Sequence, residues 1–309
     1  MKLLKSLLSN RKALAGLVIL LLFVLMAYLP MLFTSNANPD DPAQFDPNLP
    51  LSSAHLLGTT SLGQDVYSLL IYGARQSLQI AVIAGFFATV LSVLIGVSAA
   101  YLGGLVDDVL SLLTNVVLII PSFPLIVILA KYAGQSNTVM IVVLVVTGWS
   151  YGANQMRAQA LSLRNREFLE SARVRGERRS YIIVFEMLPT MSSLIVANFL
   201  GAALYSVGAA AGLQFLGLGD QSHDSWGLML YWAHSQEALQ TGSPWWALAP
   251  GLAIALLGAS FALMNYAFDE IGNPALRPVR RKDLRAGSRP GKPKKSTKEG
   301  SDRVLIDAA

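Results

Sequence analysis

Six long runs without a charged residue are the strongest constraint on how this 309-residue chain can fold. Each run can supply the roughly 20 apolar residues that a helix needs to cross the hydrocarbon core of a bilayer. Inside a membrane every backbone N–H and C=O must be paired within the protein, so runs of this kind predict helices. The sequence therefore predicts an all-α integral membrane protein with six transmembrane helices, within residues 13–33, 76–106, 109–130, 132–156, 187–219 and 238–268.

Composition agrees with this class. Charged residues make up 14% of the chain, hydrophobic residues 53%, and the mean hydropathy is +0.48. These three values are typical of a membrane protein and not of a soluble domain. The chain has no Cys, which excludes disulfides, thiolate metal sites and a cysteine nucleophile. Pro121 and Pro124 fall inside the third run and predict a kink there.

The runs and the segments between them divide the chain into five parts. Residues 1–12 form a short cytoplasmic N-terminus, and residues 13–33 form the first transmembrane helix, because this run is too long for the apolar region of a cleaved signal peptide. Residues 34–75 are rich in Pro and Asp and predict an extracytoplasmic loop. Residues 76–276 form a five-helix core that includes a charged segment at 164–190. Residues 277–309 form a basic tail, which we expect to be disordered and to lie in the cytoplasm.

The positive charges predict the orientation in the membrane. Of the 24 Lys and Arg residues, all but Arg75 and Lys131 fall in the N-terminus, the 164–190 region with its flanking Arg157, or the C-terminal tail. Alternating spans place these three regions on one side, and positively charged flanks stay on the cytoplasmic side. We therefore expect both termini and residues 164–190 to be cytoplasmic, in a multi-pass protein of the cell membrane.

The charged segment at 164–190 has the pattern of two short amphipathic helices. Phe168, Leu169 and Ala172 form a narrow apolar stripe in the first helix, and Gly176 is expected to end it. In the second helix the apolar spacing runs from Tyr181 to Leu188, before a proline. A helix–Gly–helix with one apolar face and a basic remainder is suited to docking into the groove of a partner.

This segment resembles the "EAA–G–LP" loop of binding-protein-dependent ABC transporter permeases. The resemblance rests on Glu170-Ser171-Ala172, Gly176 and Leu188-Pro189, with Ser171 where the family usually has Ala. It implies a type I ABC importer permease-like fold with cytoplasmic coupling helices that dock onto an ATPase subunit. The residues that it assigns to ATPase coupling are Phe168, Leu169, Glu170, Ser171, Ala172, Gly176, Tyr181, Leu188 and Pro189.

Two further motifs resemble the dipeptide/oligopeptide group of these permeases. The first leads out of the loop into the second span, and the second lies between the fifth and sixth spans. Thr60, Gln64 and Leu69 depart from the group's pattern, which usually has a charged residue at these positions. The residues that carry the resemblance are Gly58, Thr59, Gly63, Asp65, Tyr72, Gly73 and Arg75 in the first motif and Phe215, Gly217, Gly219 and Trp226 in the second.

No enzyme site is expected, because the six runs offer no paired ionisable or nucleophilic groups. His223, Asp224 and His234 lack a recognised ligand spacing, so no metal site is predicted. Small polar groups within the spans are the possible pathway residues, and Trp226, Trp232, Trp245 and Trp246 are interpreted as anchors at the membrane interface. The possible pathway residues are Asn115, Ser122, Asn198 and Ser206.

The family resemblance implies a permease subunit of an ATP-driven importer for dipeptides or oligopeptides. Its implied partners are a second, homologous permease subunit, two ATPase subunits, an extracytoplasmic substrate-binding protein and the lipid membrane, but no nucleic acid. No cofactor is expected on this chain, since ATP and Mg²⁺ would be held by the ATPase subunits. Import of nickel or oligosaccharides by the same architecture stays open. An ion-coupled secondary transporter is the alternative class, although such proteins usually carry ionisable groups inside the membrane.

Overall fold

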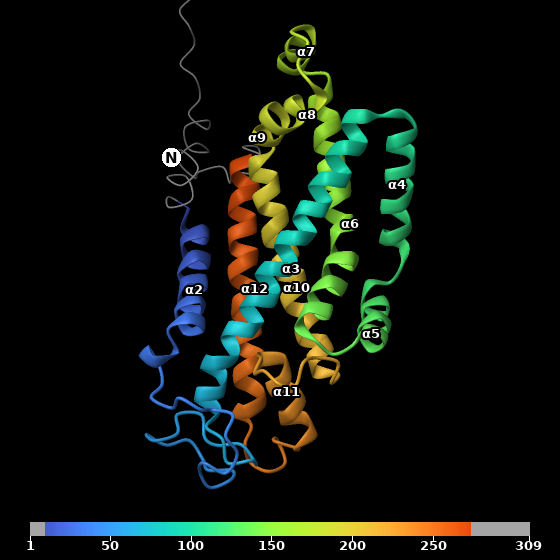
Figure 1. Cartoon of the computed structure of the whole chain (residues 1–309). Coiled ribbons are helices and arrows are strands. Elements are labelled where there is room, and N and C mark those ends of the chain that lie inside the picture. The colour runs from blue at the N-terminus through green and yellow to red at the C-terminus, as the bar shows by residue number, and fades with distance from the viewer. Residues whose placement is uncertain (1–9, 273–309) are drawn as a thin grey trace, which may run out of the picture.

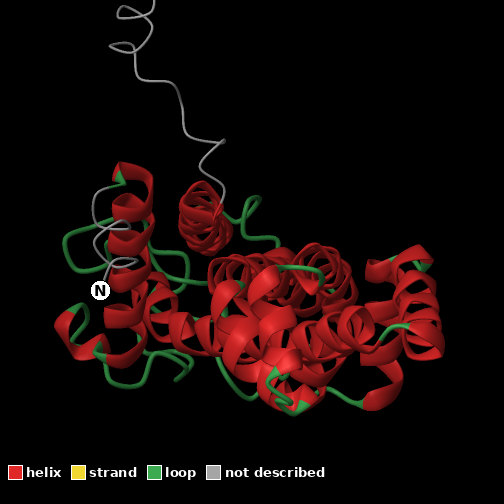
Figure 2. Ribbon diagram, turned by 90° about the horizontal axis from the view of Figure 1, so that it is seen from above, coloured by secondary structure: helices red, strands yellow, loops and turns green. Residues whose placement is uncertain are grey.

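The computed structural model describes residues 10–272, and these residues fold into helices and loops without a named strand (Figure 2). One isolated bridge, between Thr59 and Asp65, is the only β pairing within this range. The predictions for residues 1–9 and for the basic tail from 277 lie outside the described residues.

Within residues 10–272, five helices are long and apolar enough to cross a membrane, and a bent helix pair supplies a sixth span when it is taken as one. The all-α prediction with six spans is therefore confirmed in this form. The long helices are α2 (Arg11–Tyr28), α3 (Val66–Leu102), α6 (Asn137–Arg164), α10 (Ser192–Phe215) and α12 (Trp245–Gly272), and the bent pair is α4 (Gly104–Ile119) with α5 (Ser122–Ala133).

The third span is broken by a sharp bend. The axes of α4 and α5 differ by 89°, and the break falls at Ile120 and Pro121. Proline has no N–H for the helical ladder and its ring disfavours a helical conformation of the residue before it. Ile120 is accordingly extended, with ψ of 128°. The predicted kink is confirmed, and it is large enough to make two helices.

Several helices extend past the predicted ranges, and two boundaries in the N-terminal third of the chain are wrong in ways that bear on the motifs. The first helix ends at Tyr28 and not at residue 33, because Pro30 follows and starts the short 3-10 helix η1 (Pro30–Leu32). The second long helix, α3, begins at Val66 within the predicted loop, since the Asp65 side chain accepts a hydrogen bond from the Ser68 backbone N–H and caps it. The first motif therefore continues into a helix, where Arg75 remains exposed on the surface.

The bundle is built around α3, which runs diagonally across it (Figure 1). This helix packs along α6 and α10, while α10 also packs along α12, and α12 along α2. Close approach is possible where the facing residues are small, as at Gly85, beside which the Ala203 backbone runs. The bent pair of α4 and α5 lies at one edge of the bundle (Figure 1). Its first helix has a single buried residue, Thr114, so most of α4 is open to lipid or to another subunit.

The two ends of the bundle carry different structures (Figure 1). At one end, called the coupling end below, lie α7 (Glu167–Val174), α8 (Arg179–Tyr181), the π-helical segment η2 (Ile182–Met187) and α9 (Leu188–Thr190). At the opposite end, called the loop end, lie residues 34–65 and α11 (Trp226–Ser235). Pro189 lies in the first turn of α9, where proline is tolerated because the N–H groups at a helix start have no helical partner, and the π-helical segment precedes it.

Candidate functional site

The helix α7 is amphipathic and lies on the end of the bundle. Leu169 and Ala172 are fully buried in a hydrophobic cluster with Tyr101 of α3 and Met156 of α6. On its other side Phe168 and the polar residues of the motif are exposed. Burying two apolar side chains fixes the helix on the bundle, and its outer face is left free for a partner.

Gly176 ends α7 in the predicted way. Its φ is +77°, a conformation that residues with a Cβ rarely adopt. The Gly176 N–H donates to the Arg173 carbonyl at 2.9 Å, and the Glu177 N–H donates to the Ala172 carbonyl at 3.2 Å. This pair of bonds is the Schellman motif, which satisfies carbonyls that the helix end would otherwise leave unpaired.

The outer surface of the coupling end is apolar and basic. Tyr181 and Phe185 are exposed, and their rings lie 4.8 Å apart between centroids. Exposed Phe168 and Val174 add to this surface, and Arg166, Arg173, Arg175, Arg178 and Arg179 are exposed within the same segment. Of the remaining predicted coupling residues, Leu188 is half-buried, and Ser171 and Pro189 are exposed. An apolar patch with a positive rim has the character of a docking surface.

Glu170 is exposed, and its carboxylate makes no hydrogen bond or ion pair within residues 10–272. Within the described residues this group therefore does not fix the loop through a charge-assisted hydrogen bond. Arginine performs that role instead. The Arg173 guanidinium lies 5.5 Å from the Tyr101 ring centroid, and its Nη2 donates to the Arg164 carbonyl at 2.9 Å. These contacts attach α7 to the ends of α3 and α6.

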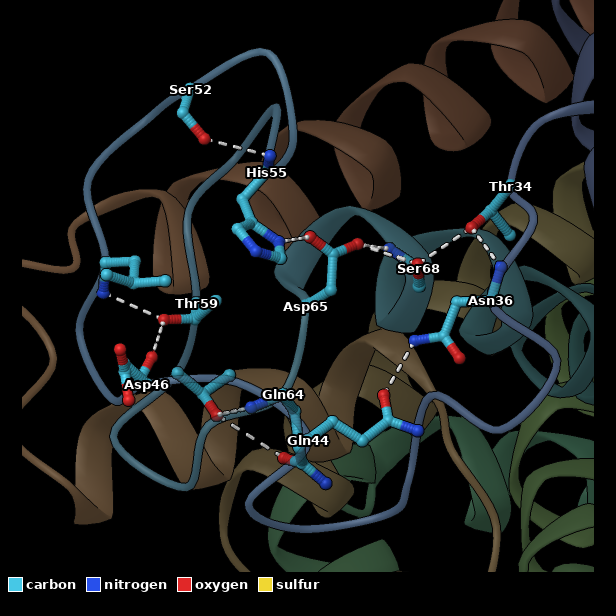
Figure 3. A network of polar contacts seen from close by, with 12 residues as sticks. Thr34, Asn36, Gln44, Asp46, Ser52, His55, Thr59, Gln64, Asp65 and Ser68 are labelled. Carbon is cyan, nitrogen blue, oxygen red and sulfur yellow. Dashed lines mark hydrogen bonds and ion pairs between the residues drawn. The ribbon is translucent and has the colours of Figure 1, made fainter.

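At the loop end, residues 34–65 are held in one conformation by side-chain hydrogen bonds (Figure 3). The Asp65 carboxylate is at the centre, where it accepts bonds from the Ser68 N–H and hydroxyl and lies 3.0 Å from His55 Nδ1. Ser68 also bonds Thr34 at 2.8 Å. The loop therefore presents an ordered surface, although it contains no regular strand.

The other residues of the first motif support this loop and its helix. Thr59 is buried, donates to the Asp46 carbonyl and accepts from the Leu49 N–H. Gly58 and Gly63 lie where the backbone of residues 45–50 passes too close for any side chain. Gln64, which replaces the group's usual Arg, donates to the Asp40 carbonyl at 2.8 Å. In α3, Tyr72 is half-buried and Arg75 lies 5.9 Å from the Tyr28 ring centroid.

The second motif ends α10 and starts α11. Gly217 has a φ of +74°, and the bonds from Gly217 N to Gln214 O and from Leu218 N to Leu213 O form a second Schellman motif. Phe215 is exposed and packs near His234, with ring centroids 5.5 Å apart, whereas Gly219 is buried against Gln214. The motif thus reverses the chain at the end of a long helix.

Trp226 is not an interfacial anchor. It is fully buried, its Nε1 donates to the Leu70 carbonyl at 2.9 Å, and its ring meets Phe23 edge-on at 5.1 Å. Gly73 of α3 lies directly beneath it. Trp246 is also buried, so the anchor interpretation is wrong for both, because their rings fill the space between helices at the loop end.

The residues between α10 and α11 do not assemble a metal site. Within residues 10–272 no three His, Cys, Asp or Glu side chains are grouped to hold an ion. Hydrogen bonds from the Ser222 hydroxyl and backbone lower the pKa of Asp220. Burial raises the pKa of Asp224 to about 8, and the Asp40 carboxyl beside it acts in the same direction. An acid that is neutral near physiological pH is a poor ligand for a cation.

A cavity of about 680 Å³ lies between the bend of α4 and α5 and the helices α6, α10 and α12. None of its lining residues, all within the described range, carries a charge. Polar groups are contributed mainly by α6, and α10 and α12 contribute two residues each. The polar lining residues are Ser122, Thr147, Ser150, Tyr151, Gln155, Asn198, Tyr205, Asn265 and Tyr266.

Two of the four possible pathway residues, Ser122 and Asn198, line this cavity. Asn115 lines a separate, much smaller cavity between α3, α4 and α6, and Ser206 is buried outside both. The pathway role of all four stays a prediction. Tyr205 and Asn265 were not singled out from the sequence. The seven-residue spacing from Asn198 to Tyr205 places both on one helix face, and this spacing is a signal by which the sequence could have indicated Tyr205.

These features define a class of protein: a multi-pass helical membrane protein with an amphipathic docking helix at one end, an ordered loop at the other and an uncharged cavity between its helices. The chain belongs to the family described as binding-protein-dependent transport system inner membrane component, which matches residues 92–270. A second family, described as the N-terminal TM domain of oligopeptide transport permease C, matches residues 2–50. The family resemblance stated from the motifs is confirmed.

Two curated relatives extend over most of the chain. The dipeptide transport system permease protein DppC of Alkalihalophilus pseudofirmus is 30% identical over 279 residues, which cover 88% of this chain and 89% of the relative. The oligopeptide transport system permease protein OppC of Mycobacterium tuberculosis is 32% identical over 279 residues, covering 89% and 94%.

A solved structure supports the fold. A chain of the MetNI methionine ABC transporter superposes with a TM-score of 0.51 at 19% identity, covering 68% of this chain and 97% of that chain. The prediction of a permease-type helical fold is therefore confirmed.

Proposed function

We propose that this protein is a membrane-spanning permease subunit of an ATP-driven importer for dipeptides or oligopeptides. The observation that carries the proposal is the amphipathic helix α7, with Leu169 and Ala172 buried in the bundle and an apolar, basic surface facing outward. Such a surface is suited to a partner that moves and transmits its motion to the bundle. The peptide class is supported by what the curated relatives are named to transport.

The two ends of the helical bundle are the docking positions for the partner proteins. Two ATPase subunits, which would hold ATP and Mg²⁺, dock through residues 165–190 and through the equivalent segment of a second, homologous permease subunit. A substrate-binding protein docks at the loop end, where the hydrogen-bonded loop offers a preformed surface. The chain itself carries out no catalysis and needs no cofactor.

The orientation is part of the proposal. The coupling end and both termini lie on the cytoplasmic side of the cell membrane, and the loop end lies on its extracytoplasmic side. The basic residues around α7 support this side assignment. Because the chain has no native Cys, single cysteines can test it without background. Arg175→Cys should react with a membrane-impermeant reagent only after the cells are opened, and Ser222→Cys should react in intact cells. Labelling of position 175 from outside would overturn the orientation.

The transport path lies along the cavity between α4–α5, α6, α10 and α12, and the second permease subunit closes it. Its uncharged lining favours a peptide over nickel, for which it offers no carboxylate, imidazole or thiolate ligand. The same lining argues against an ion-coupled secondary transporter, which requires a coordinating or titratable site. An oligosaccharide remains the second candidate substrate, because its hydroxyl groups would also suit a neutral polar wall.

Uptake by the reconstituted importer tests the proposal. Proteoliposomes that contain both permease subunits, the ATPase subunits and a docking-competent binding protein should accumulate labelled peptide only with ATP. A neutral pathway selects weakly, so exchanging the binding protein for one of altered specificity should change which peptide enters. Absence of ATP-dependent peptide uptake in an intact complex would refute the proposed function, whereas retention of the original preference would refute only the weak selection.

A further inference from the structure

One wall of the cavity combines two polar side chains with two glycines. Asn198 and Tyr205 lie seven residues apart on α10, on one face of that helix. Gly152 and Gly148 lie four residues apart on α6, opposite them. A Cβ at Gly152 would collide with the Asn198 amide, and one at Gly148 would lie 3.2 Å from the Tyr205 ring. The glycines therefore make the room that the two polar side chains occupy.

Both polar side chains have an atom without a partner. Asn198 Oδ1 and Tyr205 Oη are buried and make no hydrogen bond within the described residues. Asn198 as a whole is 9% exposed, and both residues line the cavity. A buried polar group without a partner destabilises the empty protein, so its presence requires an explanation. A ligand that supplies the missing bonds is one such explanation.

Two neighbouring polar groups on the same wall, those of Thr147 and Asn265, already have partners. The Thr147 hydroxyl donates to the Val143 carbonyl of its own helix at 2.9 Å. Asn265 Nδ2 donates to the Ala197 carbonyl at 3.1 Å, which ties α12 to α10. Of the buried polar side-chain atoms on this wall, only Asn198 Oδ1 and Tyr205 Oη lack a partner within the described residues. A carbonyl oxygen and a phenol oxygen can both accept a hydrogen bond.

We infer that Asn198 and Tyr205 form a subsite that binds backbone amide N–H groups of a peptide during its passage. This inference rests on the proposed function and adds the chemistry by which the path holds its substrate. A peptide backbone supplies N–H donors without a net charge, which matches two acceptors in a wall that has no charged residue.

The decisive experiment separates a ligand-binding role from a structural one. Tyr205→Phe removes one hydroxyl and keeps the ring that packs on Gly148. Because that hydroxyl has no partner in the empty protein, the melting temperature of the purified complex should stay the same or rise. Peptide uptake at limiting peptide should fall about tenfold, as expected when a hydrogen bond of about 1.4 kcal/mol is lost. Tyr132→Phe, an exposed tyrosine outside the cavity, is the matched control and should change neither quantity.

A second variant and a second substrate make the test specific. Asn198→Leu keeps a similar shape without the acceptor and should also lower uptake of peptide. The wild-type complex should transport a peptide with N-methylated backbone amides less well than its parent, after correction for binding-protein affinity. The difference in transport between the N-methylated peptide and its parent should be smaller in the Tyr205→Phe complex.

The outcomes are distinguishable. A fall in melting temperature that accompanies lost uptake in both variants would show a structural role and overturn the inference. Unchanged uptake in both variants would overturn it as well, and so would equal sensitivity of wild type and Tyr205→Phe to N-methylation. If the wild-type complex imports no peptide at all, the proposed function itself fails.

Discussion

Arg157 of α6 binds Asp107 of α4 through two parallel hydrogen bonds, Nε to Oδ1 at 2.6 Å and Nη2 to Oδ2 at 2.8 Å. Fork-to-fork geometry of this kind is the strongest form of a salt bridge, because both bonds are charge-assisted. The pair joins the first turn of α4 to α6, the helix that precedes α7 along the chain. It therefore connects the bent arm that borders the cavity with the coupling end.

Loss of this pair should loosen α4 from the bundle. Arg157→Gln should lower the stability of the complex by roughly 1–3 kcal/mol, a range reduced by the partial exposure of the pair. Differential scanning calorimetry of the purified complex measures the loss of stability as a fall in melting temperature. Lys131→Gln, which changes an exposed cation of α5 outside the coupling end, is the control and should change little. The double variant with the charges exchanged, Arg157→Asp and Asp107→Arg, should recover part of the lost stability. If Arg157→Gln costs no stability, or if the exchange recovers none, the pair has no role in holding α4.

Gly176 should not tolerate a β-branched residue. Its surroundings are open, so the penalty for Gly176→Val comes from the backbone alone and amounts to roughly 1–2 kcal/mol. We expect the complex to assemble but to lose ATP-dependent uptake, because the Schellman end of α7 would be distorted. Gly176→Asn should retain uptake, since Asn adopts positive φ more readily.

A matched control for this position is Gly208 of α10, which also has open surroundings but lies in an ordinary helical conformation. Gly208→Val should be tolerated. Wild-type uptake by Gly176→Val at equal expression would show that the conformation of this turn is not needed for coupling.

Asp224 should make the stability of the loop end depend on pH. Its pKa is raised to about 8 by burial and by the Asp40 carboxyl, against an unfolded value of about 3.9. The folded state thus retains a proton that the unfolded state loses, and stability falls as pH rises from about 4 to about 8. Asp224→Asn should remove this decline. Thermal unfolding of both proteins, measured across that pH range, checks this prediction, and Asp41→Asn, at an exposed position, is the control. If the melting temperatures of wild type and Asp224→Asn depend on pH in the same way, the prediction is contradicted.

Trp226 should behave as a core residue. Trp226→Phe removes the hydrogen bond to the Leu70 carbonyl and part of the ring that packs on Phe23, so we expect a loss of roughly 1–3 kcal/mol. Trp245, which is only half-buried, provides the comparison, and Trp245→Phe should cost less. If the position of Trp226 in the membrane mattered more than its packing, the two substitutions would have similar effects on the melting temperature.

Several features of the fold and the candidate site are predictable because they depend on local sequence. The uncharged runs predict the spans, since a bilayer admits only segments that pair their own backbone groups. Gly176 predicts the end of α7, and Pro121 predicts the bend, because each acts through its own backbone geometry. The buried stripe of Leu169 and Ala172 follows from helical spacing in the same way.

Predictions that assumed a side chain's surroundings from its type were less reliable. Trp226 was expected at the membrane interface because Trp is common there, yet at the start of α11 it is buried against α2 and α3. Arg75 was predicted to be the last residue of the extracytoplasmic loop, yet it lies within α3. A charged residue is compatible with a helix where, as here, its side chain is exposed on the helix surface. In both cases the decision depended on which helix packs beside the residue, and hydropathy does not contain that information.

The sequence by itself determined the membrane class, the number of spans, the helix ends at glycine and proline and the charge asymmetry between the two ends, because each depends on residues close together in the chain. Only the tertiary structure decided which side chains meet across helices. Arg157 and Asp107 are separated by 50 positions, and Asn198 meets Gly152 from a different helix. Such contacts are set by the rotation and crossing of packed helices, where small residues permit close approach, and a single sequence does not specify that geometry.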